Sequence, residues 1–375
     1  MLDWDVLGNG AGGAVLSWAT AAQYLTWAMT DVADSGPIQS AGIETMYYTQ
    51  PNRQSPSGPE YSSDETTFAH DCNGNRITAT NFPSEYLMQP SSAHLGQLWQ
   101  AEVDDVVQNE NGAYNAIYED LSDTIIYTSA TPCNWTQSAW TTASNDLDAY
   151  ENATGINLIF NGLAVLTKND DGTDSPSPSM ALTATASGGM FEGCYTTSGA
   201  FPLLHGAVWQ ATEDTEIDMQ QQQKMFFCRG DDADDAASAM NERLYQLASF
   251  LLTYKPSTSI LGESFTTPSN FHVFPEDQLI VEAPLVAEPA DISSLLETSG
   301  AYGREYARCY LAGHYVGPCG IAVNISSNAS VSFPFTKYHH ALLMAGEGIT
   351  DGGAVSTTGT LSTTMPPLSA TIAFP

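Results

Sequence analysis

The chain has 375 residues and a formal net charge of −33, which reflects a shortage of bases: 43 Asp and Glu residues accompany only 10 Lys and Arg. So few cations argue against nucleic acids and other polyphosphates as partners, because phosphate groups are bound through Lys and Arg. The hydrophobic content of 42% suffices for a globular core, and no apolar run approaches the roughly 18 residues of a membrane span.

The first 284 residues alternate between strand-like and helix-like segments. Helix-like patterns cover 14–34, 92–108, 213–224 and 233–253, and strand-like runs cover 43–49, 67–77, 114–123, 156–162, 181–192, 225–228 and 259–265. This alternation predicts an α/β fold, a (β/α)8 TIM barrel over residues 1–284. A doubly wound sheet is the structural alternative, but the glycines at 8–13 fit its phosphate-binding loop poorly.

Beyond Pro284 the helix-forming patterns fade, and Val, Thr, Ser, Gly and Tyr become frequent. Strand-like runs occur at 302–311, 320–324, 341–344 and 370–374. Closely spaced short strands with few helices predict a small antiparallel β-sandwich. We therefore expect a second domain over residues 285–375.

Six cysteines form an even set without the spacing of a zinc site. Three disulfides are expected: Cys309 with Cys319 around a predicted hairpin, Cys194 with Cys228 after predicted strands, and, by elimination, Cys72 with Cys133. Disulfides form in oxidising compartments, so we expect a secreted protein. The first residues lack the features of a signal peptide, so a leader would have to be absent from this sequence.

Carboxylates end two of the predicted strands. Glu119, Asp120 and Asp123 end the segment 114–123, and Glu192 ends another strand, with one strand between them. Catalytic groups of barrels stand at such strand ends, and two carboxyls about 5 to 10 Å apart are what cleavage of a glycosidic bond requires. Strand alternation puts Glu119 and Asp120 on opposite faces, so we expect only one to point into the cleft. The structural alternative is that these acids cap the following helices.

Further candidate binding residues stand at the ends of other predicted strands. They are Tyr48, Asp71, Arg76, Asn161, Arg229 and Glu263. In a chain with so few bases, Arg229 either binds a carboxylate of the site or pairs with the neighbouring Asp231 or Asp232. The sequence has no Gly-x-Ser-x-Gly elbow and no paired metal ligands, so we expect neither a cofactor nor a metal.

Several short motifs resemble the glycoside-hydrolase-like barrels of the α-galactosidase-type superfamily. They are Met46-Tyr-Tyr-Thr, Asn115-Ala-Ile-Tyr-Glu-Asp, Ile159-Phe-Asn-Gly and Gly189-Met-Phe-Glu-Gly. In that superfamily a β-sandwich commonly follows the barrel, and two segments here are similar to its opening strands: Gly303-Arg-Glu-Tyr-Ala-Arg-Cys-Tyr-Leu-Ala-Gly and Ile321-Ala-Val-Asn-Ile-Ser.

The resemblance implies roles for two residues. The acid of the fourth strand, here Asp120, would be the nucleophile, and the acid of the sixth strand, here Glu192, the general acid/base. Two positions depart from the pattern: Asn115 stands where an Asp is usual, and Glu119 replaces an apolar residue. The second departure leaves open whether Glu119 or Asp120 is the working group.

These observations predict a secreted glycoside hydrolase that acts on a polysaccharide or oligosaccharide through a carboxylate pair at the barrel mouth. One alternative is a non-catalytic carbohydrate-binding or surface protein on a barrel scaffold, favoured if Asp120 and Glu192 lie well beyond about 10 Å apart. The other is a cation-dependent hydrolase that uses Glu119, Asp120 and Asp123, which a bound ion would support.

Overall fold

The structure, a computed structural model, consists of two compact units. It describes residues 2–4, 18–78, 82–110, 112–120, 132–152, 155–168, 174–178, 184–196, 203–230, 240–263, 274–344 and 353–375. One unit, called the N-terminal unit, comprises Leu2–Val165 and Ser177–Phe191. The other, called the C-terminal unit, comprises Leu166–Pro176 and Glu192–Pro375.

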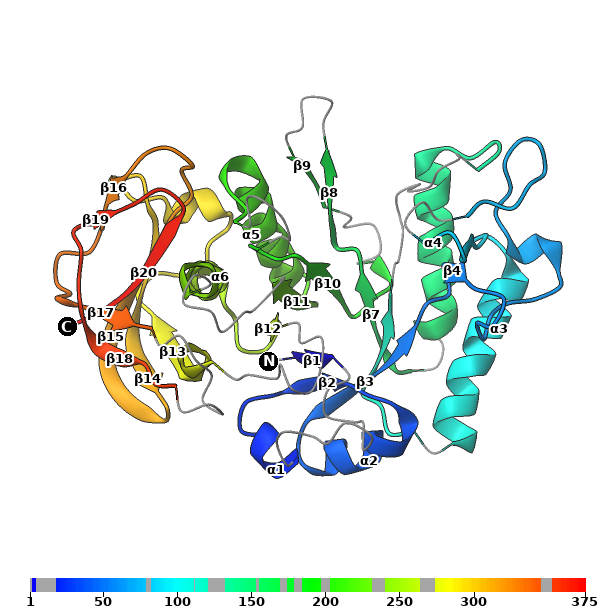
Figure 1. The fold of residues 1–375 in the computed structure, drawn as a ribbon, viewed down its shortest axis with the longest axis horizontal. Coiled ribbons are helices and arrows are strands. Elements are labelled where there is room, and N and C mark those ends of the chain that lie inside the picture. Colours follow the sequence, from blue (N-terminus) through cyan, green and yellow to red (C-terminus); the bar gives the residue numbers. More distant parts are fainter. Residues whose placement is uncertain are drawn as a thin grey trace. The chain divides into compact units, whose positions relative to one another are not determined.

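Parallel strands form the centre of the N-terminal unit (Figure 1). Each of the following strands pairs with the next: β1 (Leu2–Trp4), β2 (Trp27–Met29), β3 (Glu44–Thr49), β6 (Ala116–Glu119), β7 (Asn157–Asn161) and β10 (Gly188–Glu192). The helices are α1 (Trp18–Ala21), α2 (Val32–Ser40), α3 (Ala93–Asp104) with a π-helical continuation (Asp105–Asn109), and α4 (Gln137–Asn152). Short elements are β4 (Arg53–Gln54), a 3-10 turn (Glu65–Thr67) and β5 (Tyr86–Leu87). The strands β8 (Ala164–Lys168) and β9 (Asp174–Pro178) follow β7, and most of their residues belong to the C-terminal unit. Helices α3 and α4 pack side by side (Figure 1).

Strand β6 is buried along its whole length. Its residues Ala116, Ile117 and Tyr118 have 1% or less of their surface exposed, and so does Glu119. A parallel strand that is covered on both faces is ordinarily apolar throughout, because an unpaired buried charge is costly. A carboxylate within this strand therefore has to find partners, and these are described with the candidate site.

The predicted continuous helix over 14–34 is wrong, because in its described part only Trp18–Ala21 and the start of α2 are helical. Strand β2 interrupts it at Trp27–Met29, between the short helix α1 and helix α2. All three residues of β2 are buried, and they pair with β1 and β3. A short strand buried on both faces has no polar alternation, so its apolar residues extend the helical spacing of the flanking sequence.

Helix α2 begins where a capping residue satisfies its first turn. The Asp31 carboxylate accepts a hydrogen bond from the Asp34 backbone N–H at 3.1 Å. We expect Asp31→Ala to lower the free energy of unfolding by about 1 kcal/mol in urea denaturation, because this N–H loses its acceptor. Asp31→Asn keeps an acceptor and should stay close to wild type. An equal loss in both variants would contradict the capping role.

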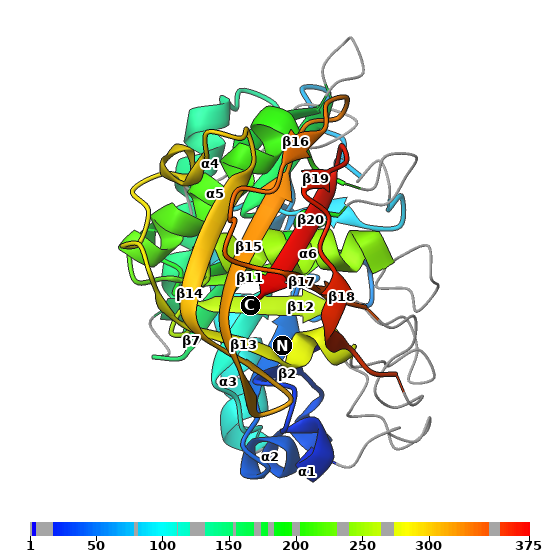
Figure 2. The ribbon, with the colours of Figure 1, turned by 90° about the vertical axis from the view of Figure 1, so that its left-hand side faces the viewer.

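In its described residues, the C-terminal unit combines two α-helices, two parallel strands and an antiparallel sheet. Its helices are α5 (Gly206–Gln221) and α6 (Met240–Thr253), and the parallel pair is β11 (Met225–Gly230) and β12 (Ser259–Glu263). The sheet, viewed in Figure 2, has the order β13 (Leu279–Pro284), β14 (Tyr302–Leu311), β15 (His314–Asn324), β20 (Ser369–Phe374), β17 (His340–Leu343) and β18 (Ser356–Thr360). A separate pair consists of β16 (Val331–Ser332) and β19 (Thr364–Met365), and 3-10 turns cover Pro275–Gln278 and Ile292–Leu295.

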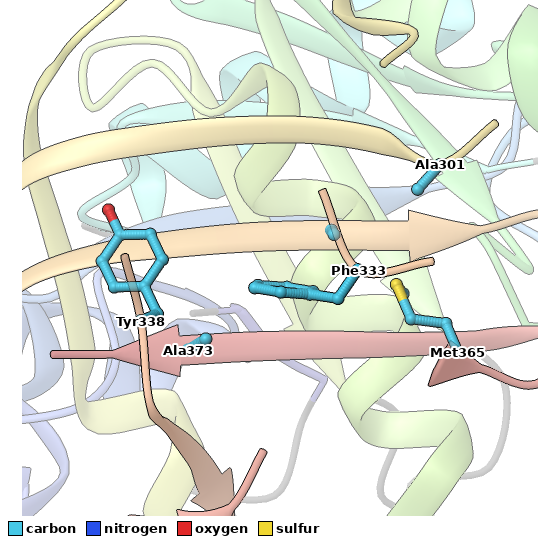
Figure 3. Close-up of a cluster of buried hydrophobic side chains, with 6 residues drawn as sticks. Ala301, Phe333, Tyr338, Met365 and Ala373 are labelled. Carbon is cyan, nitrogen blue, oxygen red and sulfur yellow. The ribbon is translucent and has the colours of Figure 1, made fainter. Parts of the chain in front are cut away.

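The two faces of the antiparallel sheet are covered differently. On one face, Arg304 and Tyr306 of β14 donate hydrogen bonds to carbonyl oxygens at the end of α6, at 2.8 and 2.5 Å. On the other face, Phe333, Tyr338 and Met365 form a buried apolar cluster (Figure 3). The predicted C-terminal antiparallel sheet is confirmed. In place of a second large sheet, a helix covers one face, and the cluster around β16 and β19 covers the other.

The prediction of an α/β fold with parallel strands is confirmed. The regular (β/α)8 alternation stays a prediction, because no α-helix follows β7 or β12 within the described residues. The predicted domain boundary at residue 284 also stays a prediction. In the structure the antiparallel sheet already begins at Leu279, and helices α5 and α6 belong to the same compact unit as that sheet.

All three predicted disulfides are confirmed: Cys72–Cys133, Cys194–Cys228 and Cys309–Cys319. The last links β14 to β15, as expected for a pair around a hairpin. Among the helices in the described ranges, none has the length and apolar character needed to cross a bilayer.

Candidate active site

Asp120 immediately follows β6, and both of its carboxylate oxygens accept hydrogen bonds. The Tyr48 hydroxyl donates to Oδ2 at 2.6 Å, and the Asn161 side-chain amide donates to Oδ1 at 2.8 Å. The Asp120 backbone N–H donates to the Thr49 carbonyl at 2.8 Å, which extends the β3–β6 ladder by one residue. Two charge-assisted bonds from neighbouring strands therefore fix the orientation of this carboxylate.

The register of three parallel strands explains why these side chains meet. Phe160 of β7 pairs with Glu119 of β6, so Asn161 stands level with Asp120. Tyr48 of β3 stands two residues before that level. Because side chains alternate along a strand, all three members of the group project from the same face of the sheet. The structure thus brings together three of the residues predicted from the sequence.

Glu119 lies on the opposite face and has 1% of its surface exposed. The Asn52 amide donates a hydrogen bond to its Oε1 at 2.5 Å. Asp148 of α4 is a further neighbour and is fully buried, and burial together with Glu119 raises the pKa of Asp148 well above its usual range. Glu119 therefore faces the helices, whereas Asp120 faces Tyr48 and Asn161.

The phenol of Tyr48 is held in its neutral form. Burial raises its pKa above the usual range, and the adjacent Asp120 carboxylate adds to this because a phenolate beside it would be repelled. Tyr48 therefore remains a hydrogen-bond donor to Asp120 at any ordinary pH. With 37% of its surface exposed, Tyr48 also leaves this group accessible from solvent.

Glu192 and Arg229 form a second group, in the C-terminal unit. Glu192 is the last residue of β10, and Arg229 of β11 donates to its Oε1 in an ion pair. The Glu192 side chain is 44% exposed, whereas that of Arg229 is 12% exposed. The Cys194–Cys228 disulfide and a backbone hydrogen bond from Cys194 N–H to the Arg229 carbonyl at 2.9 Å hold this region together. Among the predicted partners of Arg229, the structure shows Glu192, whereas Asp231 and Asp232 lie outside the described residues.

Asp71 and Arg76 have partners outside the Asp120 group. The predicted strand over 67–77 is a turn, closed by a bridge between His70 and Arg76, and no parallel strand ends there. Hydrogen bonds from the side chain and backbone of Asn75 hold the pKa of Asp71 at about 2. Arg76 donates to the Glu65 carboxylate and lies over the Phe68 ring at 3.6 Å. Both residues thus have structural partners in this turn.

Glu263 and Asp123 are the remaining candidate residues at strand ends. The backbone of Glu263 ends β12 level with Gly230 of β11, and Asp123 lies outside the described residues. Glu119 and Asp120 have separate partners on opposite faces, so they do not form a chelating pair. Over the described ranges, no group of three or more His, Cys, Asp or Glu side chains is arranged to hold a metal ion.

Sequence reasoning missed a set of carboxyls buried on the helix-facing side of β6. Glu60 and Glu151 have 1% or less of their surface exposed, like Glu119 and Asp148. Burial, with the Glu102 carboxyl, raises the pKa of Glu60 to about 10, and burial with neighbouring acids raises that of Glu151 to about 8. These acids are held neutral at pH values where exposed ones ionise. The shortage of Lys and Arg was the sequence signal for such a set, because a buried acid then has few cationic partners and has to be protonated instead.

Comparison with known proteins gives no match to a family model and no match among curated proteins. Among solved structures, the glycoside hydrolase domain of PelA from Pseudomonas aeruginosa is 10% identical, with 71% of this chain and 95% of that chain covered and a TM-score of 0.46. Ega3 from Aspergillus fumigatus, solved with galactosamine, is 14% identical, with coverages of 70% and 90% and a TM-score of 0.44. An α-amylase from Lactobacillus plantarum is 9% identical, with coverages of 100% and 98% and a TM-score of 0.45. Likenesses this distant carry no argument about activity, which has to come from the site.

Proposed function

We propose that the chain is a glycoside hydrolase whose nucleophile, or base if the enzyme inverts, is Asp120. The observation that carries this proposal is the Asp120 carboxylate held by Tyr48 and Asn161 at the carboxyl ends of parallel strands. Catalytic groups of α/β barrels stand at such ends. Because Glu119 is buried against the helices, this arrangement favours Asp120 of the two adjacent acids.

We infer further that the parallel strands of this chain form a closed (β/α)8-type barrel. The strand order β1-β12-β11-β10-β7-β6-β3-β2 supports this inference. In such a barrel only β7 separates β6 from β10. Asp120 and Glu192 would then stand on one rim, as a carboxylate pair requires.

Glu192 is the proposed general acid/base. In a retaining reaction, an Asp120 oxygen bonds to the anomeric carbon as the glycosidic C–O bond breaks, and Glu192 gives its proton to the departing oxygen. A water then gives a proton to the Glu192 carboxylate, and its oxygen replaces Asp120 on the anomeric carbon. In an inverting reaction, Asp120 takes the proton from the water, which attacks in one step. Arg229 positions Glu192 through the ion pair.

Two properties of the chain support a secreted protein that binds carbohydrate. Three disulfides suit an oxidising compartment. A chain with 10 Lys and Arg against 43 Asp and Glu disfavours anionic partners, nucleic acids among them, but leaves neutral glycans open.

The test is a screen for release of reducing ends from a panel of polysaccharides at about pH 4 to 6. We expect wild type to act on at least one glycan and Asp120→Asn to release nothing above background. The matched control is Glu288→Gln, which removes an exposed carboxylate paired with Lys255 and should act like wild type. Activity that survives in Asp120→Asn would refute the assignment.

One observation favours a second candidate, a non-catalytic carbohydrate-binding protein. Glu192 is held in an ion pair with Arg229, whereas a general acid has to carry a proton. This candidate predicts binding of a glycan by wild type without any product. Equilibrium dialysis of a glycan that is bound but not cleaved over days would support it against the hydrolase.

A further inference from the structure

A pocket of about 600 Å³ opens in the N-terminal unit, away from the residues that hold Asp120. Its walls come from three segments: 65–70 around the 3-10 turn, 89–94 at the start of α3, and 133–135 before α4. The first two segments belong to the connection that leaves the end of β3, and the third belongs to the connection that leaves the end of β6. These are the strands that carry Tyr48 and Asp120.

The walls of this pocket are firmly connected to one another. The Cys72–Cys133 disulfide joins the two connections, and Cys133 N–H donates to the His70 carbonyl at 2.8 Å. Across the rim, the His94 imidazole pairs with Asp64 at 2.8 Å. A pocket built in this way loses little conformational entropy when a ligand enters.

An aromatic ring and neutral polar groups lie in the pocket wall beside the ionisable side chains Glu65, His70 and His94. Trp135 supplies a half-buried ring, braced edge-on against Trp140 at a centroid distance of 5.3 Å, whereas Phe68 in the wall is only 2% exposed. Gln89 and Ser91 supply an amide and a hydroxyl, already linked by a hydrogen bond of 3.0 Å. A sugar ring has the same two characters, because its C–H faces pack on aromatic rings and its hydroxyls exchange hydrogen bonds with amides and hydroxyls.

The charged side chains around the pocket disfavour anionic sugars. Glu65 lies in the wall, and Arg76, which could have attracted an anion, is engaged by that carboxylate and stacked on Phe68. The cationic side chains at the pocket already face carboxylates, because His70 and Arg76 pair with Glu65 and His94 pairs with Asp64. A uronate or a sulfated sugar would have to compete with these carboxylates, on a protein whose net charge is −33. We propose that this pocket is an accessory binding site for an uncharged sugar residue of a glycan. That this glycan is also the substrate rests on the proposed hydrolase function.

The test measures binding without turnover. In an Asp120→Asn background, hexasaccharides of glucose, galactose, mannose and xylose are titrated by calorimetry, with polygalacturonate as the anionic comparison. We expect at least one neutral hexasaccharide to bind and polygalacturonate not to bind. Trp135→Ala should weaken that binding at least about tenfold, and Gln89→Ala should weaken it several-fold, because one removes a ring and the other a hydrogen-bonding group. Thermal unfolding checks that Trp135→Ala is folded, since this ring also packs on the buried cluster around Trp140.

Tyr315→Ala is the matched control, because this ring is 59% exposed and lies on β15 of the other unit. The Tyr315→Ala variant should bind the hexasaccharide with the same affinity as the Asp120→Asn protein from which all these variants are made. The accessory site is refuted if none of the neutral hexasaccharides binds, if polygalacturonate binds better, or if Trp135→Ala and Gln89→Ala both bind like the parent. Hydrolysis by wild type with unaltered binding in the pocket variants would refute the site alone. Binding lost in those variants, with no hydrolysis by wild type, would refute the proposed function alone.

Discussion

The free energy of unfolding of this protein should fall as the pH rises from about 4.5 towards 9. A carboxyl whose pKa is raised by folding binds its proton more tightly in the folded state, so its stabilising effect is complete below the unfolded pKa and is lost as the pH passes the folded one. Glu216 of α5 is fully buried, and burial raises its pKa from 4.5 to about 7. This residue alone should remove about 3 kcal/mol over that interval.

Burial is the reason why Glu216 carries a proton, because its hydrogen-bond donors favour the ionised form. Ser259 and Gln220 donate to its Oε1 at 2.7 and 3.1 Å, and the Tyr195 hydroxyl donates to Oε2 at 3.4 Å. These neutral donors lower its pKa, but burial outweighs them. The neighbouring Glu213 is also buried, and burial with Glu216 raises its pKa well above the usual range. Glu60, Asp148 and Glu151 act in the same direction in the N-terminal unit.

The measurement is urea denaturation at several pH values between about 4.5 and 9, with wild type and two variants. Glu216→Gln keeps the shape and an acceptor but cannot titrate, so its stability should decline less steeply between about pH 4.5 and 7. Glu288→Gln, at an exposed site, should follow wild type. Stability that is constant or rises over this interval in wild type would show that the buried carboxyls are not protonated.

Parts of the candidate active site around Asp120 could be predicted because they depend on residues that are neighbours in the sequence. An apolar strand that ends in acids points to Asp120, and the alternation of side chains shows that only one of two adjacent acids can face a given side. Which of the two faces the helices depends on Asn52 and Asp148, which are distant from Glu119 in sequence. No short-range pattern encodes that contact. The disulfides could be predicted because elimination leaves few pairings once two of them flank regular elements.

The two wrong secondary-structure predictions, the helix over 14–34 and the strand over 67–77, have a common physical origin. Strand β2 is buried on both faces, so its apolar residues matched a helix, although Asp31, the N-cap of α2, marked a new start there. Asp71 and Arg76 were assigned to the end of a strand, but an Asp-x-x-Gly turn stands in that place. Periodicity identifies amphipathic surfaces well and fails where both faces are covered or where side chains cap the backbone.

Asp120→Asn should lower kcat by about 10⁴-fold or more on the glycan that wild type cleaves, because the amide can neither attack the anomeric carbon nor activate water. The comparison that decides between adjacent acids is Glu119→Gln. The Asn52 amide can still donate to the Gln oxygen, so this variant should fold and retain most of its activity. Loss of activity in Glu119→Gln, with activity kept in Asp120→Asn, would reverse the assignment.

The two donors to Asp120 allow a finer test of how its carboxylate works. Tyr48→Phe and Asn161→Ala each remove one charge-assisted hydrogen bond, worth about 1.5 to 3 kcal/mol, so each should lower kcat by about 10- to 100-fold. If the bonds only supported the fold, the variants would lose thermal stability while kcat stayed the same. Because the two bonds hold one group, we expect their effects in the double variant to be non-additive. Additive losses would mean that Tyr48 and Asn161 act on the substrate separately, and not through Asp120.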